Sequence, residues 1–315
     1  MILTGDIGGT KTLLALHDER GAIVHRGRFS SLEAAAFDRL VARFLDTAPA
    51  RARVACLGIA GPVLGDRVKV THLPWEIDGP ALAARFGLAS VRLLNDFAAA
   101  AHGIGALSAD DIVTLQAGEP MADRPRVVIG AGTGLGLAYL LGETLLSGEA
   151  GHAAFAPGDL AQHELWRWLH RRHGRVEVEH VVSGRGLADI DDFLRGREPG
   201  TTRRDTPESD RAAAVAGAAL DDGDAQALAA VDLFLSCYGA LAGDHALTVM
   251  ARGGVYLAGG IAPKLLPRIR AGGFLSAFND KGAQSDWVRA CPVHVVTNPD
   301  LPLLGAARVA LRDAR

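Results

Sequence analysis

The sequence predicts an α/β fold in two domains, and three observations lead to this prediction. Short apolar segments typical of strands alternate along the chain with helical patterns, which is the order found in α/β proteins. Glycine-rich turns separate several of these segments. The 315 residues suffice for about two domains at roughly 150 residues each. With 49% hydrophobic and 22% charged residues, the chain can bury a sizeable core, which excludes a mainly disordered protein.

The first hundred residues are expected to open with a strand hairpin around the turn Gly8-Gly9-Thr10. A helix is expected over Leu32–Thr47, because apolar residues recur there near a helical period. Buried strands are expected at 53–59 and 91–94, and the second of these ends at Asn95-Asp96. Strands joined by a helical segment favour the α/β architecture again.

The second half of the chain repeats the opening pattern. Apolar segments at 127–129 and 135–140 flank a second glycine turn, so we expect two halves that share one fold. The most polar segment, 195–211, predicts an exposed loop. The later elements are predicted as a long helix at 224–250, a strand at 255–258 that ends at Gly259-Gly260, and a helix at 303–311.

Charge and cysteine content narrow the class of protein. The 33 basic and 36 acidic residues leave a net charge of −3, which argues against a general nucleic-acid or membrane-surface binder. The longest uncharged run, 127–142, falls short of the ~20 residues that span a bilayer. Cys56, Cys237 and Cys291 share no paired spacing and predict buried thiols in a reducing compartment. No secretory signal is visible, so we expect a cytoplasmic protein.

Three glycine turns are the candidate phosphate-binding elements. A turn of small residues between strands presents successive backbone N–H groups to an anion. Asp6 stands at the first turn, where a carboxylate can hold a phosphate-bound Mg²⁺. A P-loop is excluded, because Thr10 stands where that motif needs glycine and a strand follows. The candidate residues for the nucleotide are Asp6, Gly8, Gly9, Thr10, Lys11, Gly132, Thr133, Gly134, Gly259 and Gly260.

Six segments in order resemble a known family. DIGGTK at 6–11, GAGTGLG at 130–136 and LAGGIAP at 257–263 resemble the phosphate and adenosine segments of the actin–hexokinase–Hsp70 superfamily. LLNDFAA at 93–99, SGEAGHAAFAP at 147–157 and EHVVSGRGL at 179–187 are similar to bacterial glucokinases that lack the zinc-binding cysteines of ROK sugar kinases. The resemblance runs from residue 3 to about residue 308.

This resemblance implies a two-domain actin-like ATPase fold, ribonuclease H-like, with a cleft between the domains. The small domain would comprise 1–106 and 298–315, and the large domain 107–297. The implied activity is ATP-dependent phosphorylation of the 6-hydroxyl of glucose, with ATP and Mg²⁺ as cofactors. A homodimer that takes glucose and ATP as its partners, and neither nucleic acid nor membrane, is also implied.

The resemblance assigns Asp96 as the general base. It assigns the sugar to Asn95, Asp96, Glu149, His152 and Glu179. Carboxylates and amides suit this task, because neighbouring sugar hydroxyls each donate and accept hydrogen bonds. Two positions depart from the family: Ala150 stands where glycine is usual, and Arg185 where proline is common.

Several alternatives stay open at this stage. Glu177, one strand step before Glu179, is an alternative sugar ligand. Another hexose, such as mannose, fructose or N-acetylglucosamine, is an alternative substrate, because one hydroxyl epimer is decided by pocket geometry. A non-catalytic sugar sensor on the same fold is a third possibility, and the negative net charge argues against its DNA-binding form. Trp75 is expected to pack at the domain edge rather than to stack on a sugar. Four histidines are expected to be solvated or capping residues and not a metal cluster: His163, His170, His173 and His180.

Overall fold

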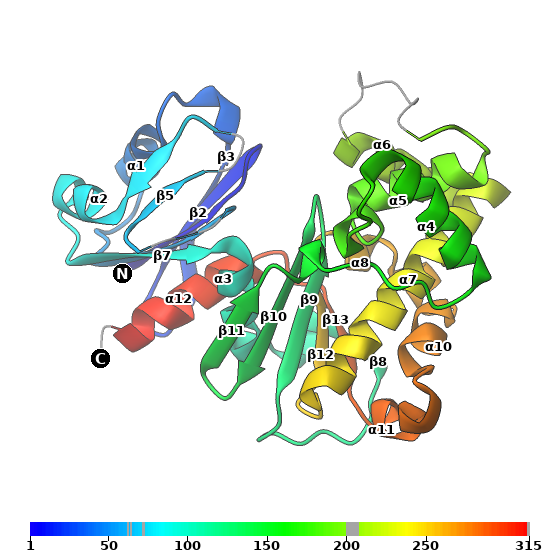
Figure 1. The fold of residues 1–315 in the computed structure, drawn as a ribbon. Coiled ribbons are helices and arrows are strands. Elements are labelled where there is room, and N and C mark those ends of the chain that lie inside the picture. Colours follow the sequence, from blue (N-terminus) through cyan, green and yellow to red (C-terminus); the bar gives the residue numbers. More distant parts are fainter. Residues whose placement is uncertain (62, 64, 71–72, 200–207, 314–315) are drawn as a thin grey trace. The chain divides into compact units, whose positions relative to one another are not determined.

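In the computed structural model the chain divides into two compact units. The first unit contains Met1–Ser108 and Asn298–Arg315, and the second contains Ala109–Thr297. The structure describes every residue except 62, 64, 71–72, 200–207 and 314–315, so the middle of the polar segment 195–211 lies outside the described residues. Each unit is built on one large sheet with helices packed on it, as the α/β prediction requires (Figure 1).

The sheet of the first unit has the strand order β3-β2-β1-β4-β7. β1 pairs antiparallel with β2 across the predicted glycine turn and parallel with β4, and β4 pairs parallel with β7. The first predicted hairpin is therefore confirmed. The strands are β1 Ile2–Ile7, β2 Lys11–His17, β3 Ile23–Ser30, β4 Val54–Ile59 and β7 Ser90–Asn95, with a separate ribbon of β5 Arg67–Lys69 and β6 Glu76–Asp78.

Helices cover both faces of this sheet. The alternate residues of β1 and β4 make this possible, since they point to opposite faces. Leu3 and Leu57 pack with Phe44 in one cluster, whereas Ile2 packs with Val309 in another. α3 and α12 pack against each other (Figure 1). They lie so close together that a Cβ at Gly305 would overlap the Ala99 carbonyl oxygen of α3. The helices are α1 Phe37–Asp46, α2 Gly79–Phe86, α3 Asp96–Gly103 and α12 Leu301–Asp313.

The helix predicted over Leu32–Thr47 begins later than expected. Ser31–Glu33 forms a short 3-10 turn, and α1 starts at Phe37. The cause is a long-range contact: the buried Ser31 hydroxyl donates to the Gly8 carbonyl and lies 2.9 Å from the Thr12 hydroxyl. This contact holds the chain at the first glycine turn and keeps Leu32 in solvent, where it is 73% exposed.

The second unit repeats the pairing pattern of the first. Its sheet has the order β11-β10-β9-β12-β13-β8, in which β9 pairs antiparallel with β10 and parallel with β12. An antiparallel meander followed by parallel strands is the arrangement of β1, β2, β3 and β4, so the prediction of two halves with one fold is confirmed. The strands are β8 Ile112–Gln116, β9 Arg126–Ala131, β10 Leu135–Leu141, β11 Thr144–Gly148, β12 Val255–Ala258 and β13 Val293–Val296.

The long helix predicted at 224–250 is α7, Ala225–Val249, with Asp224 as its N-cap. By length and composition α7 could cross a membrane, but half of its most apolar window is buried. Tyr238 is fully buried and donates its hydroxyl proton to the Ile129 carbonyl of β9, 3.2 Å away. α7 is therefore a core helix of this unit. The other helices are α4 Leu160–His173, α5 Gly184–Leu194, α6 Glu208–Leu220, α8 Ile261–Lys264, α9 Leu266–Ile269, α10 Gly273–Asn279 and α11 Ser285–Arg289.

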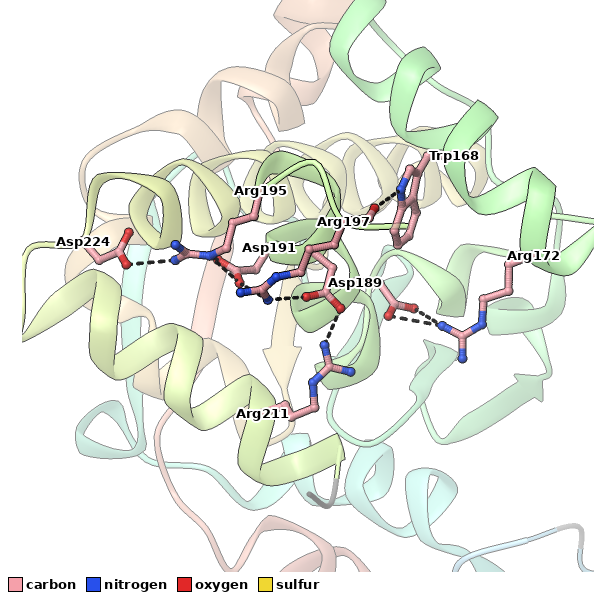
Figure 2. Close-up of polar contacts among 9 residues, drawn as sticks. Trp168, Arg172, Asp189, Asp191, Arg195, Arg197, Arg211 and Asp224 are labelled. Atoms are coloured by element: carbon pink, nitrogen blue, oxygen red, sulfur yellow. Dashed lines mark hydrogen bonds and ion pairs between the residues drawn. The ribbon is translucent and has the colours of Figure 1, made fainter. Parts of the chain in front are cut away.

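The exposed loop predicted at 195–211 is confirmed in part, because Gly196, Arg197 and Glu198 are exposed and lie outside helices and strands. α6 already begins at Glu208, and the arginines that flank residues 200–207 are paired with carboxylates of α5 (Figure 2). Arg195 Nε donates to Asp191, 2.9 Å away, and Arg211 Nη2 donates to the buried Asp192 at 2.6 Å. Sequence polarity could not reveal the second pair, because Arg211 lies on α6 and its partner Asp192 on α5.

Candidate active site

The first glycine turn joins β1 to β2 and is fixed by its own backbone. The Gly8 N–H donates to the Lys11 carbonyl at 3.0 Å, and the Ser31 N–H donates to the Thr10 carbonyl at 3.0 Å. Gly8, Gly9 and Thr10 thus form a tight, pinned loop at the end of β1. Such a loop can present backbone N–H groups to an anion without reorganising.

Asp6 is the penultimate residue of β1, close to this turn, and its buried carboxyl group lies in an environment unfavourable to its charge. Burial, with a smaller contribution from the Asp96 charge, raises the pKa of Asp6 to about 6, although Lys11 acts in the opposite direction. Two acidic groups of the first unit therefore act on each other. A carboxyl group held in this way favours a bound proton or cation, because either removes the unfavourable buried charge.

Asp96 stands at the junction of β7 and α3. Asn95 is the N-cap of α3, and its Oδ1 accepts from the N–H groups of Phe97 and Ala98 at 3.0 and 3.1 Å. Asn95, and not Asp96, therefore caps this helix. Asp96 is the first helical residue, and its Oδ1 accepts from the Phe97 N–H at 2.8 Å. Asn95 also donates from Nδ2 to the Gly61 carbonyl, so the whole junction is rigidly held.

The second glycine turn joins β9 to β10 and holds a carboxylate against itself. The Leu135 N–H donates to Glu179 Oε2 at 2.8 Å. A Cβ added at Gly134 would lie 2.5 Å from that oxygen, and one at Gly151 would lie 3.3 Å from it. A side chain at Gly134 would therefore displace the Glu179 carboxylate, and one at Gly151 would crowd it. Glu179 links the second turn to the loop that carries Gly151.

The third glycine turn lies beside the second. Gly259 follows β12 with a φ of +80°, a conformation that glycine adopts without strain. A Cβ at Gly259 would lie 2.7 Å from the Ala131 carbonyl oxygen, the residue that precedes the second turn. The Gly184 N–H at the start of α5 donates to the Gly132 carbonyl at 2.8 Å. Predicted nucleotide residues around 132 and 259 are thus neighbours in the second unit.

The loop between β11 and α4 presents Glu149 and His152. A 3-10 turn over Ala150–His152 follows Glu149 and keeps Glu149 and His152 in one short loop. His152 Nδ1 lies 2.8 Å from Glu177 Oε2, and this bond raises the pKa of His152 and lowers that of Glu177. Glu179, in contrast, faces the second glycine turn. The two neighbouring glutamates therefore have different partners, which spacing alone could not reveal.

Other predictions away from these turns can also be compared with the structure. Cys56, Cys237 and Cys291 are free, buried thiols, as predicted. Trp75 is 2% exposed and donates its indole N–H to the Ala34 carbonyl, so it packs in the core. His180 accepts the Glu177 N–H at Nδ1 and caps a 3-10 turn, which agrees with the capping role expected for it.

The whole chain is similar to one enzyme family. The family model described as Glucokinase matches residues 3–313. The chain is 38% identical to a glucokinase of Nostoc sp. over 99% of both chains, and 35% identical to that of Mesorhizobium japonicum over 98% of this chain and 91% of the relative. The chain belongs to the glucokinase family.

Solved glucokinases share the fold. A glucokinase from an Antarctic psychrotroph superposes with a TM-score of 0.86 at 29% identity, covering 99% of this chain and 98% of that one. A ROK family glucokinase from Streptomyces griseus, in complex with glucose and AMPPNP, gives a TM-score of 0.66 at 21% identity, with 98% of each chain covered. The two-domain actin-like architecture implied by the sequence is therefore confirmed for this glucokinase family member.

Proposed function

We propose that this chain is an ATP-dependent glucokinase that transfers the γ-phosphoryl group of ATP to the 6-hydroxyl of glucose. One observation carries the proposal: the family match over residues 3–313 includes Asp96, which the first turn of α3 holds at the end of β7. Asp96 is assigned as the general base. It accepts the proton of the 6-hydroxyl while that oxygen bonds to phosphorus and the bond to ADP breaks.

A rigidly held carboxylate is sufficient for this step. Phosphoryl transfer passes through a loose transition state, so positioning and charge neutralisation matter more than strong basicity. The cap formed by Asn95 fixes the backbone on which Asp96 stands. Asn95, Glu149, His152 and Glu179 are assigned to the sugar hydroxyls, since amides, imidazoles and carboxylates together supply both donors and acceptors.

The three glycine turns are assigned to ATP. Their residues in this role are Gly8, Gly9, Thr10, Lys11, Gly132, Thr133, Gly134, Gly259 and Gly260. Asp6 fits a magnesium ligand, because burial and the Asp96 charge leave its carboxylate in need of a compensating cation. Mg²⁺, when bound, would neutralise phosphate charge there. Lys11 adds a positive charge at the same turn.

We also propose a cytoplasmic homodimer, as the family resemblance implies. Three free and buried thiols support a reducing compartment. Light scattering of the purified protein tests the dimer. A monomer across the working concentration range would refute it.

The activity test is coupled ADP release with ATP·Mg²⁺ and glucose, mannose, fructose or N-acetylglucosamine, beside a sugar-free control. Turnover selective for glucose is expected. A preference for another hexose would keep the mechanism and change the substrate. Sugar binding by calorimetry without any sugar-dependent turnover would refute the kinase assignment.

The base role of Asp96 has its own test. Asp96→Asn is expected to keep glucose binding within a few fold and to lower kcat by roughly 10²–10⁴, the usual range for a general base. Near-normal kcat would remove Asp96 from this role.

A further inference from the structure

His152 is exposed, yet its ring is held by a neighbour. The side chain of His152 is 58% exposed, whereas that of its partner Glu177 is 24% exposed. The 2.8 Å contact joins His152 Nδ1 to Glu177 Oε2. An exposed pair of this kind fixes a ring only if the carboxylate is itself immobile, because two free side chains lose entropy on pairing.

Glu177 meets that condition through contacts of both its backbone and its carboxylate. Its N–H donates to His180 Nδ1 at 3.1 Å, and it forms an isolated antiparallel bridge with Ala154. Its second carboxylate oxygen lies 3.7 Å from Arg175 Nε. The Val178 N–H donates to the Ala153 carbonyl next to His152, so the backbones of the two partners are tied as well.

Arg175 contacts both His152 and Glu177. Its Nη2 donates to the His152 carbonyl at 3.3 Å, while its Nε approaches Glu177. Arg175 therefore contacts both the backbone of His152 and the carboxylate that holds the His152 ring. His180 is stacked on His173 with ring centroids 3.9 Å apart, which restricts the acceptor of the Glu177 N–H.

We propose that Glu177 is a positioning residue for sugar binding, which orients the ring of His152 so that Nε2 is presented to a sugar hydroxyl. This inference rests on the proposed function. Glu177 does not contact the sugar in this role, and Glu179 keeps the direct role assigned to it. The bond at Nδ1 determines which ring nitrogen carries a proton and which faces the ligand.

The electrostatics of the loop agree with this geometry. The hydrogen bond to Glu177 raises the pKa of His152, and the charges of Glu179 and Glu149 raise it further. Arg175, the cation at this site, contacts the His152 carbonyl rather than the ring. Burial lowers the pKa of His180, which keeps its Nδ1 able to accept the Glu177 N–H.

The test compares Glu177→Ala and Glu177→Gln with Glu164→Gln, a control at an exposed glutamate of α4 whose side chain lies 3.8 Å from Arg167. Glu177→Ala is expected to raise the KM for glucose about 3- to 10-fold, the effect of one lost hydrogen bond, with kcat within twofold. Glu177→Gln keeps an acceptor oxygen, so its KM should lie between those of the wild type and Glu177→Ala. The control should leave both constants unchanged.

A second readout follows His152 directly. NMR titration of its ring, assigned with His152→Gln, should show a lower pKa in Glu177→Gln than in the wild type. An unchanged His152 pKa, or a glucose KM in Glu177→Ala equal to that of the control, would overturn the inference even if the variant were less stable. Absence of glucose turnover in the wild type would instead remove the proposed function, and this inference with it.

Discussion

Replacing Asp6 with asparagine is expected to stabilise the unliganded protein while it abolishes turnover. The carboxyl group of Asp6 has a pKa of about 6 in the folded chain against an ordinary value of 3.8. At about 1.4 kcal/mol per pH unit, this difference corresponds to about 3 kcal/mol of lost stability once the group is ionised. Asparagine has nearly the same shape and carries no charge, so it removes the penalty.

The sign of the pH dependence follows from the raised pKa. Below about pH 3 the carboxyl group is protonated in both the folded and the unfolded chain, and Asp6→Asn should match the wild type. Between pH 4 and pH 6 the unfolded chain ionises first, so the wild type loses stability as pH rises. Above pH 6 the difference reaches its full value, equivalent to about 5–10 °C in Tm.

The assay is scanning calorimetry from pH 4 to pH 7.5 in the presence of EDTA, which keeps cations from Asp6. Asp46→Asn, at an exposed position near the end of α1, is the matched control and should show no such trend. An Asp6→Asn variant no more stable than the wild type at pH 7.5 would refute the reasoning. A stability gain that is equal at pH 4 and pH 7.5 would refute it too.

Two glycine substitutions test close packing, one beside the Glu179 carboxylate and the other between α3 and α12. Gly134→Ala should displace Glu179 and weaken glucose binding measured by calorimetry without nucleotide, by roughly fivefold or more, whereas Gly132→Ala, with open space at its Cβ, should not. Equal glucose affinities in the two variants would contradict the link between Glu179 and the second turn. Gly305→Ala should lower the free energy of unfolding in urea by about 1–3 kcal/mol, because overlap with α3 outweighs the gain in helix propensity. Gly217→Ala, on α6 with no close neighbour, should raise it by up to about 1 kcal/mol, and a gain at both positions would show that the close packing of Gly305 is not limiting.

The sequence predicted those helices and strands that are determined by residues close together along the chain. The hairpins around Gly8 and Gly132 follow from glycine turns between apolar segments, and the position of α7 follows from its apolar period. The start of α1 did not follow, because it depends on the bond from Ser31 to a residue over twenty positions away. The pairing of Arg211 with Asp192 could not be predicted for the same reason, because the two residues lie on different helices.

The candidate site shows the same division. Sequence motifs selected Asp96 and Glu179, but neither the strain on Asp6 nor the task of Glu177 has a motif of its own. Residues 177 and 179 are two positions apart, so strand alternation would place both glutamates on one side, and no sequence signal separates them. The 3-10 turn over Val178–His180 breaks this alternation. Which glutamate faces His152 is decided by the bridge from Glu177 to Ala154, a contact between segments about twenty residues apart.

Asp192 and Asp6 differ in whether the fold neutralises their carboxylates, and this difference separates a structural acid from a candidate metal ligand. Asp192 is buried on α5, but Arg197 and Arg211 neutralise it at 2.7 and 2.6 Å, so its charge is satisfied within the fold. Lys11 lowers the pKa of Asp6, but burial and the Asp96 charge raise it by more, so the pKa of Asp6 is higher than its ordinary value. A carboxylate that the fold leaves strained is poised for a cation that arrives with the substrate, whereas one paired with arginines is not. This contrast supports assigning Mg²⁺ to Asp6 and not to the more numerous acids of α5.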